Sequence, residues 1–250
     1  MKTKTASLSQ VASAFLIACV SFFLACGLAA AQSAPEGGGG KEVLSVGWQS
    51  GYCAARPKSR GCTDFSATSA AAQRFSLNSR FLIRRSYCGI EDGVRQQARK
   101  GKWTDLPEIT LASGTRERLL AAMPAARVGM DRQQWLRSGS CVTTSAEAYY
   151  SRSLDLLDQF NASPVPSLFA GKAGGAITLA EVRAAFDKAF GPGAGERVRL
   201  TCRKAGDRTV VIGLTIGLAA GEGPLSQLIG GASPTKSRCT EGFTGAGQAG

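Results

Sequence analysis

The chain of 250 residues contains no histidine, and this absence limits the chemistry that its side chains can perform. Histidine titrates near neutrality, and it serves as the base in Ser/His/Asp triads and Cys/His dyads and as a common zinc ligand. Any catalysis would have to use carboxylates, lysine, tyrosine or thiols. The remaining residues of chemical interest are the cysteines and a short segment, 133–141, that combines two glutamines, a tryptophan, an arginine and a serine with a cysteine.

The cysteines predict disulfide bonds rather than a metal site. Two of the eight, Cys19 and Cys26, lie in an apolar N-terminal stretch; the other six are Cys53, Cys62, Cys88, Cys141, Cys202 and Cys239. Six is an even number, and an exported chain meets an oxidising compartment, so three disulfides are expected among 15 possible connectivities. Because no C-x-x-C pair and no histidine is present, we predict no metal and no other cofactor.

The N-terminus has the features of a secretory signal. Lys2 and Lys4 precede an apolar run over 11–28, and three alanines at 29–31 offer a cleavage site. We predict a signal peptide over 1–31, a flexible Gly-rich lead-in over 32–42 and one domain over 43–250. The mature protein would be secreted or periplasmic, without a membrane span, and monomeric. The alternatives are a membrane anchor formed by the apolar run and a lipoprotein modified at Cys19.

Basic residues gather in the middle of the chain, whose net charge is +12. Between Arg74 and Arg137 there are thirteen arginines and lysines against six acidic residues. One interpretation is a groove that binds RNA, another polyanion or an acidic envelope component. The other is a solvated basic surface without a ligand. The sequence alone leaves both open.

The elements that must position these residues belong to an α+β domain. Apolar residues at every second position predict strands over 43–48, 75–78, 198–202 and 210–218. Apolar residues at helical spacing predict helices over 113–123, stopped by Pro124, and over 145–160. Thr178 and Glu181 form the sequence pattern of a capping box, which predicts a helix from there to Phe190.

Several motifs resemble those of the ribonuclease T2 family of secreted endoribonucleases. Trp48 to Cys53 reads WQSGYC, where the family has W-x-x-G-[FY]-C. Phe75 to Phe81 reads FSLNSRF in place of F-[ST]-x-H-G-L-W, and Gln133 to Cys141 reads QQWLRSGSC in place of H-E-[WY]-x-K-H-G-x-C. The resemblance implies a central antiparallel sheet flanked by helices in one disulfide-bonded domain. It also implies the pairs Cys53–Cys62, Cys88–Cys141 and Cys202–Cys239.

The family's catalytic side chains are replaced in this sequence. The first-motif histidine corresponds to Asn78, and the histidine, glutamate, lysine and last histidine of the second motif correspond to Gln133, Gln134, Arg137 and Ser138. Amides and a hydroxyl cannot exchange a proton near pH 7, and each lost acid or base costs about 10²- to 10⁴-fold in rate. We therefore expect no catalytic residue and no RNA cleavage. Arg137 keeps the positive charge of the lysine and suits a phosphate.

The resulting prediction is an inactive relative that binds RNA or another polyanion. Arginines near the two motifs are the candidate contacts: Arg80, Arg84, Arg85, Arg132 and Arg137. Aromatic side chains near them that could stack on bases are Phe81, Tyr87, Trp103 and Trp135. Core packing is the commoner role of such residues, and we assign Trp135, like Trp48, to the core. One alternative is a weak endoribonuclease that releases a 2',3'-cyclic phosphate, or a hydrolase that uses a carboxylate such as Asp131. Another is a protein-interaction module of the cell envelope.

Overall fold

The structure is a computed structural model, and it describes residues 41–59, 62, 65–66 and 69–246. The predicted signal peptide over 1–31 and the lead-in up to residue 40 lie outside the described residues. Among the described helices, none is both long enough and apolar enough to cross a membrane.

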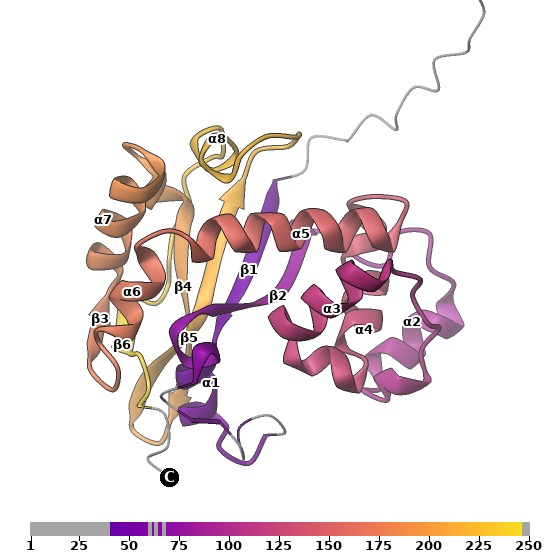
Figure 1. The fold of residues 1–250 in the computed structure, drawn as a ribbon, viewed down its shortest axis with the longest axis horizontal. Helices are drawn as coiled ribbons and strands as arrows, with labels where there is room; N and C mark the ends of the chain where they lie inside the picture. Colours follow the sequence, from indigo (N-terminus) through magenta and orange to yellow (C-terminus); the bar gives the residue numbers. More distant parts are fainter. Residues whose placement is uncertain (1–40, 60–61, 63–64, 67–68, 247–250) are drawn as a thin grey trace, which may run out of the picture. The chain divides into compact units, whose positions relative to one another are not determined.

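The described chain alternates between helices and strands in an α+β order (Figure 1). The strands are β1 (Glu42–Trp48), β2 (Phe75–Leu82), β3 (Ala176–Thr178), β4 (Val198–Ala205), β5 (Arg208–Leu218) and β6 (Glu241–Phe243). The α-helices are α1 (Gln49–Ala55), α2 (Asp92–Arg99), α3 (Ser113–Ala122), α4 (Met130–Arg137), α5 (Ala146–Asn161), α6 (Val165–Ala170), α7 (Leu179–Phe190) and α8 (Leu225–Gly230). Each segment that the sequence analysis assigned to a helix or strand forms that kind of element.

The six strands form one sheet in the order β2-β1-β5-β6-β3, with β4 paired to β5. The pairing is antiparallel except between β5 and β6, where Val210 is opposite Phe243 in a parallel arrangement. The predicted central antiparallel sheet is therefore confirmed for β2, β1, β5 and β4, and the pairing of β6 makes the whole sheet mixed. After β5 the chain passes through α8 and returns to the beginning of β5, so β6 enters the sheet in the same direction as β5.

The core lies between this sheet and α5 to α8. Leu44, Val46 and Trp48 alternate along β1 and are buried, and the Trp48 indole N–H donates to the Thr244 carbonyl at 2.9 Å. Figure 1 shows α5 running across the sheet. Helices α2, α3 and α4 lie beside the N-terminal half of α5, next to β2. Phe160 near the end of α5 is fully buried against Phe75 of β2, with ring centroids 5.1 Å apart. These contacts fix β2 against α5.

The three disulfides connect the cysteines in the pairs that the resemblance implied. Cys53–Cys62, Cys88–Cys141 and Cys202–Cys239 have Cα–Cα distances of 5.3, 4.9 and 6.2 Å. The second bridge matters most for the site. It ties the segment that follows β2 to the 3₁₀ turn η4 (Gly139–Cys141), which directly follows α4.

Candidate functional site

The first motif lies on β2, where a bulge interrupts the alternation of side chains. Ser45 of β1 is opposite Ser79 and Val46 is opposite Leu77, so Asn78 is an extra residue without a partner in the ladder. Its side chain lies across Gly47, where an added Cβ would be only 2.9 Å from the Asn78 Oδ1. The glycine in β1 therefore provides the space that Asn78 occupies.

The second motif forms α4 and the turn after it. The Trp135 ring packs over Gly139, where an added Cβ would lie 2.4 Å from the ring. This close contact and the Cys88–Cys141 bridge fix the end of α4 beside the 83–88 segment. The Tyr87 N–H donates to the Arg137 carbonyl at 2.9 Å, so backbone contacts hold the two segments together.

A hollow of 410 Å³, which we call the motif hollow, opens where the two motifs meet. Its lining consists of Ser79, Phe81, Leu82, Arg84, Arg85, Ser86, Gln134, Arg137 and Ser138. Gln134, Arg137 and Ser138 thus come together beside β2, whereas Asn78 and Gln133 are not part of this lining. The structure brings together three of the five residues that correspond to the family site.

Three arginines around the motif hollow carry unneutralised charge. Arg84, Arg85 and Arg137 are exposed. Within the described part of the chain, none of them forms a salt bridge, although other arginines do. Arg84 adopts a backbone φ of 65°, in the left-handed region that is unfavourable for a side chain with a Cβ. Three guanidinium groups around one small hollow favour an anionic ligand.

Arg80, a predicted anion contact, has a different role. Because of the bulge at Asn78, its side chain turns into the core, where it forms an ion pair with Glu42 at 2.6 Å. Its Nε donates to the Ser153 hydroxyl at 3.2 Å, and its backbone N–H donates to the Tyr149 hydroxyl at 2.9 Å. Only 8% of Arg80 is exposed. The prediction that Arg80 binds an external anion is corrected: its charge is buried and already paired.

Arg132 also serves the fold rather than the hollow. Its guanidinium donates to the carbonyls of Thr104 and Leu106 at 2.9 and 2.8 Å and pairs with Glu108 at 2.9 Å. These bonds anchor the 104–108 segment to α4, and Arg132 is not among the residues that line the motif hollow. Its prediction as an anion contact is corrected as well.

Asp131, the carboxylate considered for a hydrolase, is in no position to meet a substrate. It is 2% exposed, and its Oδ2 accepts from Arg116 at 3.2 Å. The Tyr150 hydroxyl donates to the Asp131 carbonyl at 2.5 Å, and burial raises the pKa of that tyrosine well above its usual range. Neither side chain is a base that a ligand in the motif hollow could reach.

A second hollow, of 430 Å³, shares Ser86 and Arg137 with the motif hollow; we call it the α2 hollow. Its lining consists of Ser86, Tyr87, Ala98, Arg99, Trp103, Gln133 and Arg137. Gln133 is 6% exposed, and its Oε1 is buried without a hydrogen-bond partner among the described residues. Arg99 lies over the Tyr87 ring, 5.4 Å from the centroid. Tyr87 and Trp103 are two of the aromatic candidates that the sequence offers, whereas no local pattern predicts α2.

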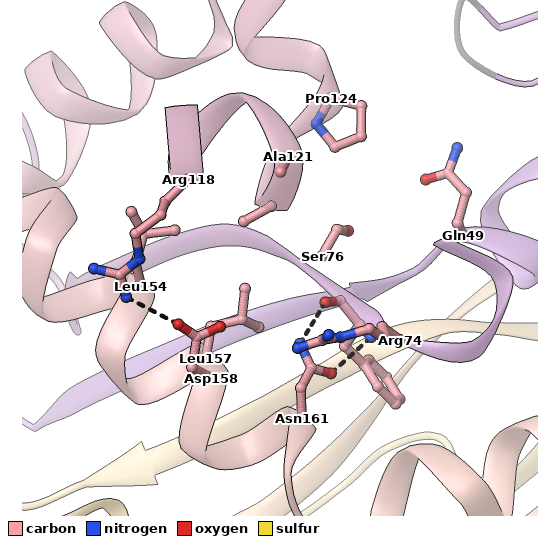
Figure 2. A pocket seen from close by; sticks show the side chains of 12 residues that line it. Gln49, Arg74, Ser76, Arg118, Ala121, Pro124, Leu154, Leu157, Asp158 and Asn161 are labelled. Atoms are coloured by element: carbon pink, nitrogen blue, oxygen red, sulfur yellow. Dashed lines mark hydrogen bonds and ion pairs between the residues drawn. The ribbon is translucent and has the colours of Figure 1, made fainter. Parts of the chain in front are cut away.

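A third pocket, of 320 Å³, lies between α3, α5 and the beginning of β2 (Figure 2). Its lining includes Ala121, Pro124, Leu154 and Leu157, which are apolar. Figure 2 shows two of the polar side chains around them, Arg118 and Asn161, engaged with the protein itself. Arg118 donates to Asp158 at 2.9 Å and to Asp155 at 2.8 Å, and the Asn161 amide exchanges two hydrogen bonds with the Phe75 backbone. Of the two arginines in this lining, Arg118 is neutralised by two carboxylates, and Arg74 forms no salt bridge within the described part of the chain. The pocket therefore offers fewer unneutralised guanidinium groups than the motif hollow.

The motif hollow can bind charge, but its own side chains cannot move protons. Its lining offers hydroxyls, an amide and guanidinium groups, none of which titrates near neutrality. In the described residues there is also no group of three acidic or sulfur-bearing side chains that could hold a metal ion.

The fold has known counterparts, although the sequence alone finds none. No protein-family model matches the chain, and no curated protein does. The self-incompatibility-associated SF11-RNase of Nicotiana alata covers 83% of this chain and 96% of its own, with 15% identity and a TM-score of 0.55. A variant of RNase MC1, a bitter gourd seed protein, in complex with 5'-GMP covers 82% and 99%, with 15% identity and a TM-score of 0.55. The S-like ribonuclease trichomaglin covers 83% and 97%, with 14% identity and a TM-score of 0.52.

These matches define the class of fold. The α+β fold of this chain is shared with these ribonucleases over most of the length of each chain. The chain has the ribonuclease T2 fold.

Proposed function

We propose that this chain is an exported, catalytically inactive protein of the ribonuclease T2 fold that binds RNA or another polyanion at the motif hollow. The observation that carries the proposal is the lining of that hollow. Arg84, Arg85 and Arg137 present three unpaired guanidinium groups, and Gln134 and Ser138 stand where the family resemblance implies an acid–base apparatus. Binding that holds a substrate and its transition state equally tightly does not lower the barrier of the chemical step.

The matched structures support a nucleotide as one class of ligand. An RNase MC1 variant was solved with 5'-GMP and another with 5'-UMP, so these proteins of the same fold hold single nucleotides. Export is supported by the predicted signal peptide over 1–31 and by the three disulfides, which persist in oxidising compartments.

The inactivity is tested by restoring the family residues. The natural protein and a variant carrying Asn78→His, Gln133→His, Gln134→Glu and Ser138→His are incubated with RNA under oxidising conditions. We expect no cleavage by the natural protein, because no lining group exchanges protons. Cleavage by the natural protein with a 2',3'-cyclic phosphate product, lost in Arg137→Ala, would refute the proposal and make the chain a residual endoribonuclease.

The binding is tested by salt-dependent retention on immobilised RNA and heparin. Removing Arg84, Arg85 and Arg137 together should lower the slope of log K against log salt by about two, given roughly 0.7 per single-strand phosphate contact. The matched control removes three exposed arginines elsewhere, Arg199→Ala, Arg203→Ala and Arg238→Ala, with the same change in net charge. Equal losses in both triple variants would mean that charge alone, and not the motif hollow, retains the polyanion.

A further inference from the structure

The pocket of Figure 2, which we call the α3–α5 pocket, has mainly apolar walls. Figure 2 shows Ala121 and Pro124 on one side of it and Leu154 and Leu157 of α5 on the opposite side. Phe75, at the start of β2, is buried and also lines the pocket. At 320 Å³ the pocket lies at the lower end of the range of about 300–1,000 Å³ for small-molecule sites. Its size and its walls therefore suit a small apolar group.

The α3–α5 pocket is preformed, because the elements around it are fixed to one another. Arg118 of α3 donates to Asp155 and Asp158 of α5 at 2.8 and 2.9 Å. The Asn161 amide at the end of α5 donates to the Phe75 carbonyl and accepts from the Phe75 N–H, each at 2.9 Å, so α5 also holds the beginning of β2. A ligand that enters the pocket does not have to order these elements, so little of its binding free energy is lost.

The polar side chains of the lining have partners in the protein, with one exception. The Gln49 amide donates to a cysteine sulfur at 3.3 Å, and the Ser76 hydroxyl donates to a carbonyl of β1 at 3.3 Å. Arg118 and Asn161 are engaged as described above. Arg74 is exposed, and within the part of the chain that the structure describes its guanidinium forms neither a salt bridge nor a hydrogen bond. The pocket thus combines apolar walls with a single cation that is left for a ligand.

We propose that the α3–α5 pocket binds a small amphipathic carboxylate, with its apolar body between α3 and α5 and its carboxylate on Arg74. Figure 2 shows Arg118 and Asp158 on one side of the pocket and Arg74 on the other, so the unneutralised charge lies at one edge. A guanidinium binds a carboxylate through two parallel hydrogen bonds. A polyanion fits less well, because it would bring further charges between apolar walls and beside Asp158, where burial of an unpaired charge is costly. The inference concerns a pocket separate from the motif hollow and does not rest on the proposed function.

The experiment follows the titration of alanine-methyl-labelled protein by NMR. The methyl signals of Ala121 and Ala122 report on the α3–α5 pocket, and that of Ala98 reports on the α2 hollow. We expect octanoate to shift the first two signals saturably and to leave the third unchanged. Because each buried methylene adds about fourfold in affinity, hexanoate should bind about 15-fold more weakly than octanoate.

The role of Arg74 is tested with 1-heptanol, which carries the same seven-carbon chain as octanoate but no charge. An exposed ion pair contributes modestly, so octanoate should bind about two- to fivefold more tightly than 1-heptanol. Arg74→Gln should remove this advantage and leave the affinity for 1-heptanol unchanged. The matched control, Arg203→Gln at an exposed residue of β4, should keep the advantage.

A second variant fills the pocket. Ala121 is an exposed residue of α3, and leucine is a good helix former, so Ala121→Leu should fold as the natural protein does while its side chain occupies space in the pocket. We expect it to lower the affinity for octanoate at least tenfold, with Ala122 as the reporting signal. Ala184→Leu, at an exposed position of α7, is the matched control and should leave the affinity unchanged.

The outcomes decide each part of the proposal. Shifts at Ala98 as large as those at Ala122, equal affinities for hexanoate and octanoate, or an affinity for octanoate that survives Ala121→Leu would overturn the pocket as the site. An advantage of octanoate over 1-heptanol that survives Arg74→Gln would overturn the role of Arg74. Thermal unfolding of each variant shows whether it is folded, and Arg74→Gln, at an exposed residue, keeps the test available if Ala121→Leu does not fold.

Discussion

The main core and the region around α2 and α4 differ in their backbone conformation and in the charge that they leave without a partner. In the main core, the Trp48 indole, the Tyr149 hydroxyl and the Asn161 amide all have protein partners. Around α2, a smaller cluster packs Tyr87 and Leu136 with Ala98 and Leu106. There the backbone of Arg84 and Tyr87 has φ values of 65° and 56°, and Gln133 keeps an unpaired oxygen.

This contrast indicates where stability and binding are located. Buried atoms without a partner among the described residues occur in both regions, for example Thr215 Oγ1 and Gln133 Oε1. The region around α2 and α4 adds guanidinium groups without an acidic partner and a left-handed backbone at Arg84 and Tyr87, from which a ligand can gain. The proposed polyanion site lies in this second region. Substitutions should therefore divide into those that lower stability without affecting binding and those that do the reverse.

The largest loss of stability is expected from breaking the buried ion pair under β2. Glu42→Leu leaves the Arg80 guanidinium buried without its carboxylate, 2.6 Å away in the natural protein. Removing one partner of a buried pair typically costs about 3–5 kcal/mol. Urea unfolding followed by circular dichroism measures the change, and heparin retention of the folded fraction should stay the same.

A double variant supplies the control. Glu42→Leu combined with Arg80→Leu replaces both charges with apolar side chains, so most of the lost stability should return. If the double variant were as unstable as Glu42→Leu alone, packing at residue 42, and not the unpaired charge, would explain the loss.

The next largest loss of stability is expected from removing a disulfide, and heparin retention should distinguish two of the three bridges. Replacing Cys88 and Cys141 with serine should cost about 2–4 kcal/mol and also weaken heparin retention, because this bridge holds the 83–88 segment beside Arg137. Replacing Cys202 and Cys239 should cost a similar amount but leave retention unchanged, since this bridge lies at β4. Equal effects of both pairs on retention would show that binding depends on overall stability alone.

The sequence predicts the main core well because its elements have strong local signals. The alternation of Leu214, Ile216 and Leu218 and the apolar positions of α5 each reflect burial on one face, and burial follows directly from spacing. The cysteine pairs could be assigned only from the resemblance, in which two of the motifs contain Cys53 and Cys141. The parallel pairing of β6 could not be predicted, since a strand of three residues has almost no periodicity.

The site was only partly predictable, and Arg80 shows why. In a regular strand, residues 75, 77, 79 and 81 would face the core and Arg80 would face outward. The extra residue at Asn78 reverses this order, so Arg80 points inward, and a bulge has no reliable sequence signal. The only sequence feature that pointed to a partner for a buried Arg80 was Glu42 in β1. The resemblance placed Gln133 at a family position. The hydrogen bonding of its Oε1 depends on how α2 packs against α4, which the sequence does not predict.

A smaller loss of stability is expected at the N-terminus of α7, where Thr178 and Glu181 cap the helix. The Thr178 hydroxyl accepts from the Glu181 N–H at 3.2 Å, and the Glu181 carboxylate accepts from the Thr178 N–H and from Lys172. Thr178→Ala should cost about 1 kcal/mol, without effect on heparin retention.

The same cap predicts a pH dependence. The bond from Lys172, followed by those from Thr178, lowers the pKa of Glu181 to about 2. A carboxyl with a lowered pKa in the folded state stabilises the protein fully above its ordinary pKa and loses this contribution as pH falls towards 2. Glu181→Gln should thus be less stable than the natural protein at pH 7, and the difference should vanish near pH 2. A difference that is constant from pH 7 to pH 2 would show that the charge of Glu181 does not contribute.

The smallest change in stability is expected at Arg84, although binding should weaken there. Arg84→Gly relieves the left-handed backbone, worth about 1–2 kcal/mol, but adds about 0.5–1 kcal/mol of chain entropy to the unfolded state. The net result should be no loss of stability, whereas Arg85→Gly, at a residue without a positive φ, should lose about 0.5–1 kcal/mol. Each variant removes one guanidinium from the motif hollow and should lower the salt slope of RNA retention by about 0.7. If Arg84→Gly were destabilised as much as Arg85→Gly, the protein would not be holding Arg84 in an unfavourable conformation. The contrast between the main core and the binding region would then lose one of its two backbone observations.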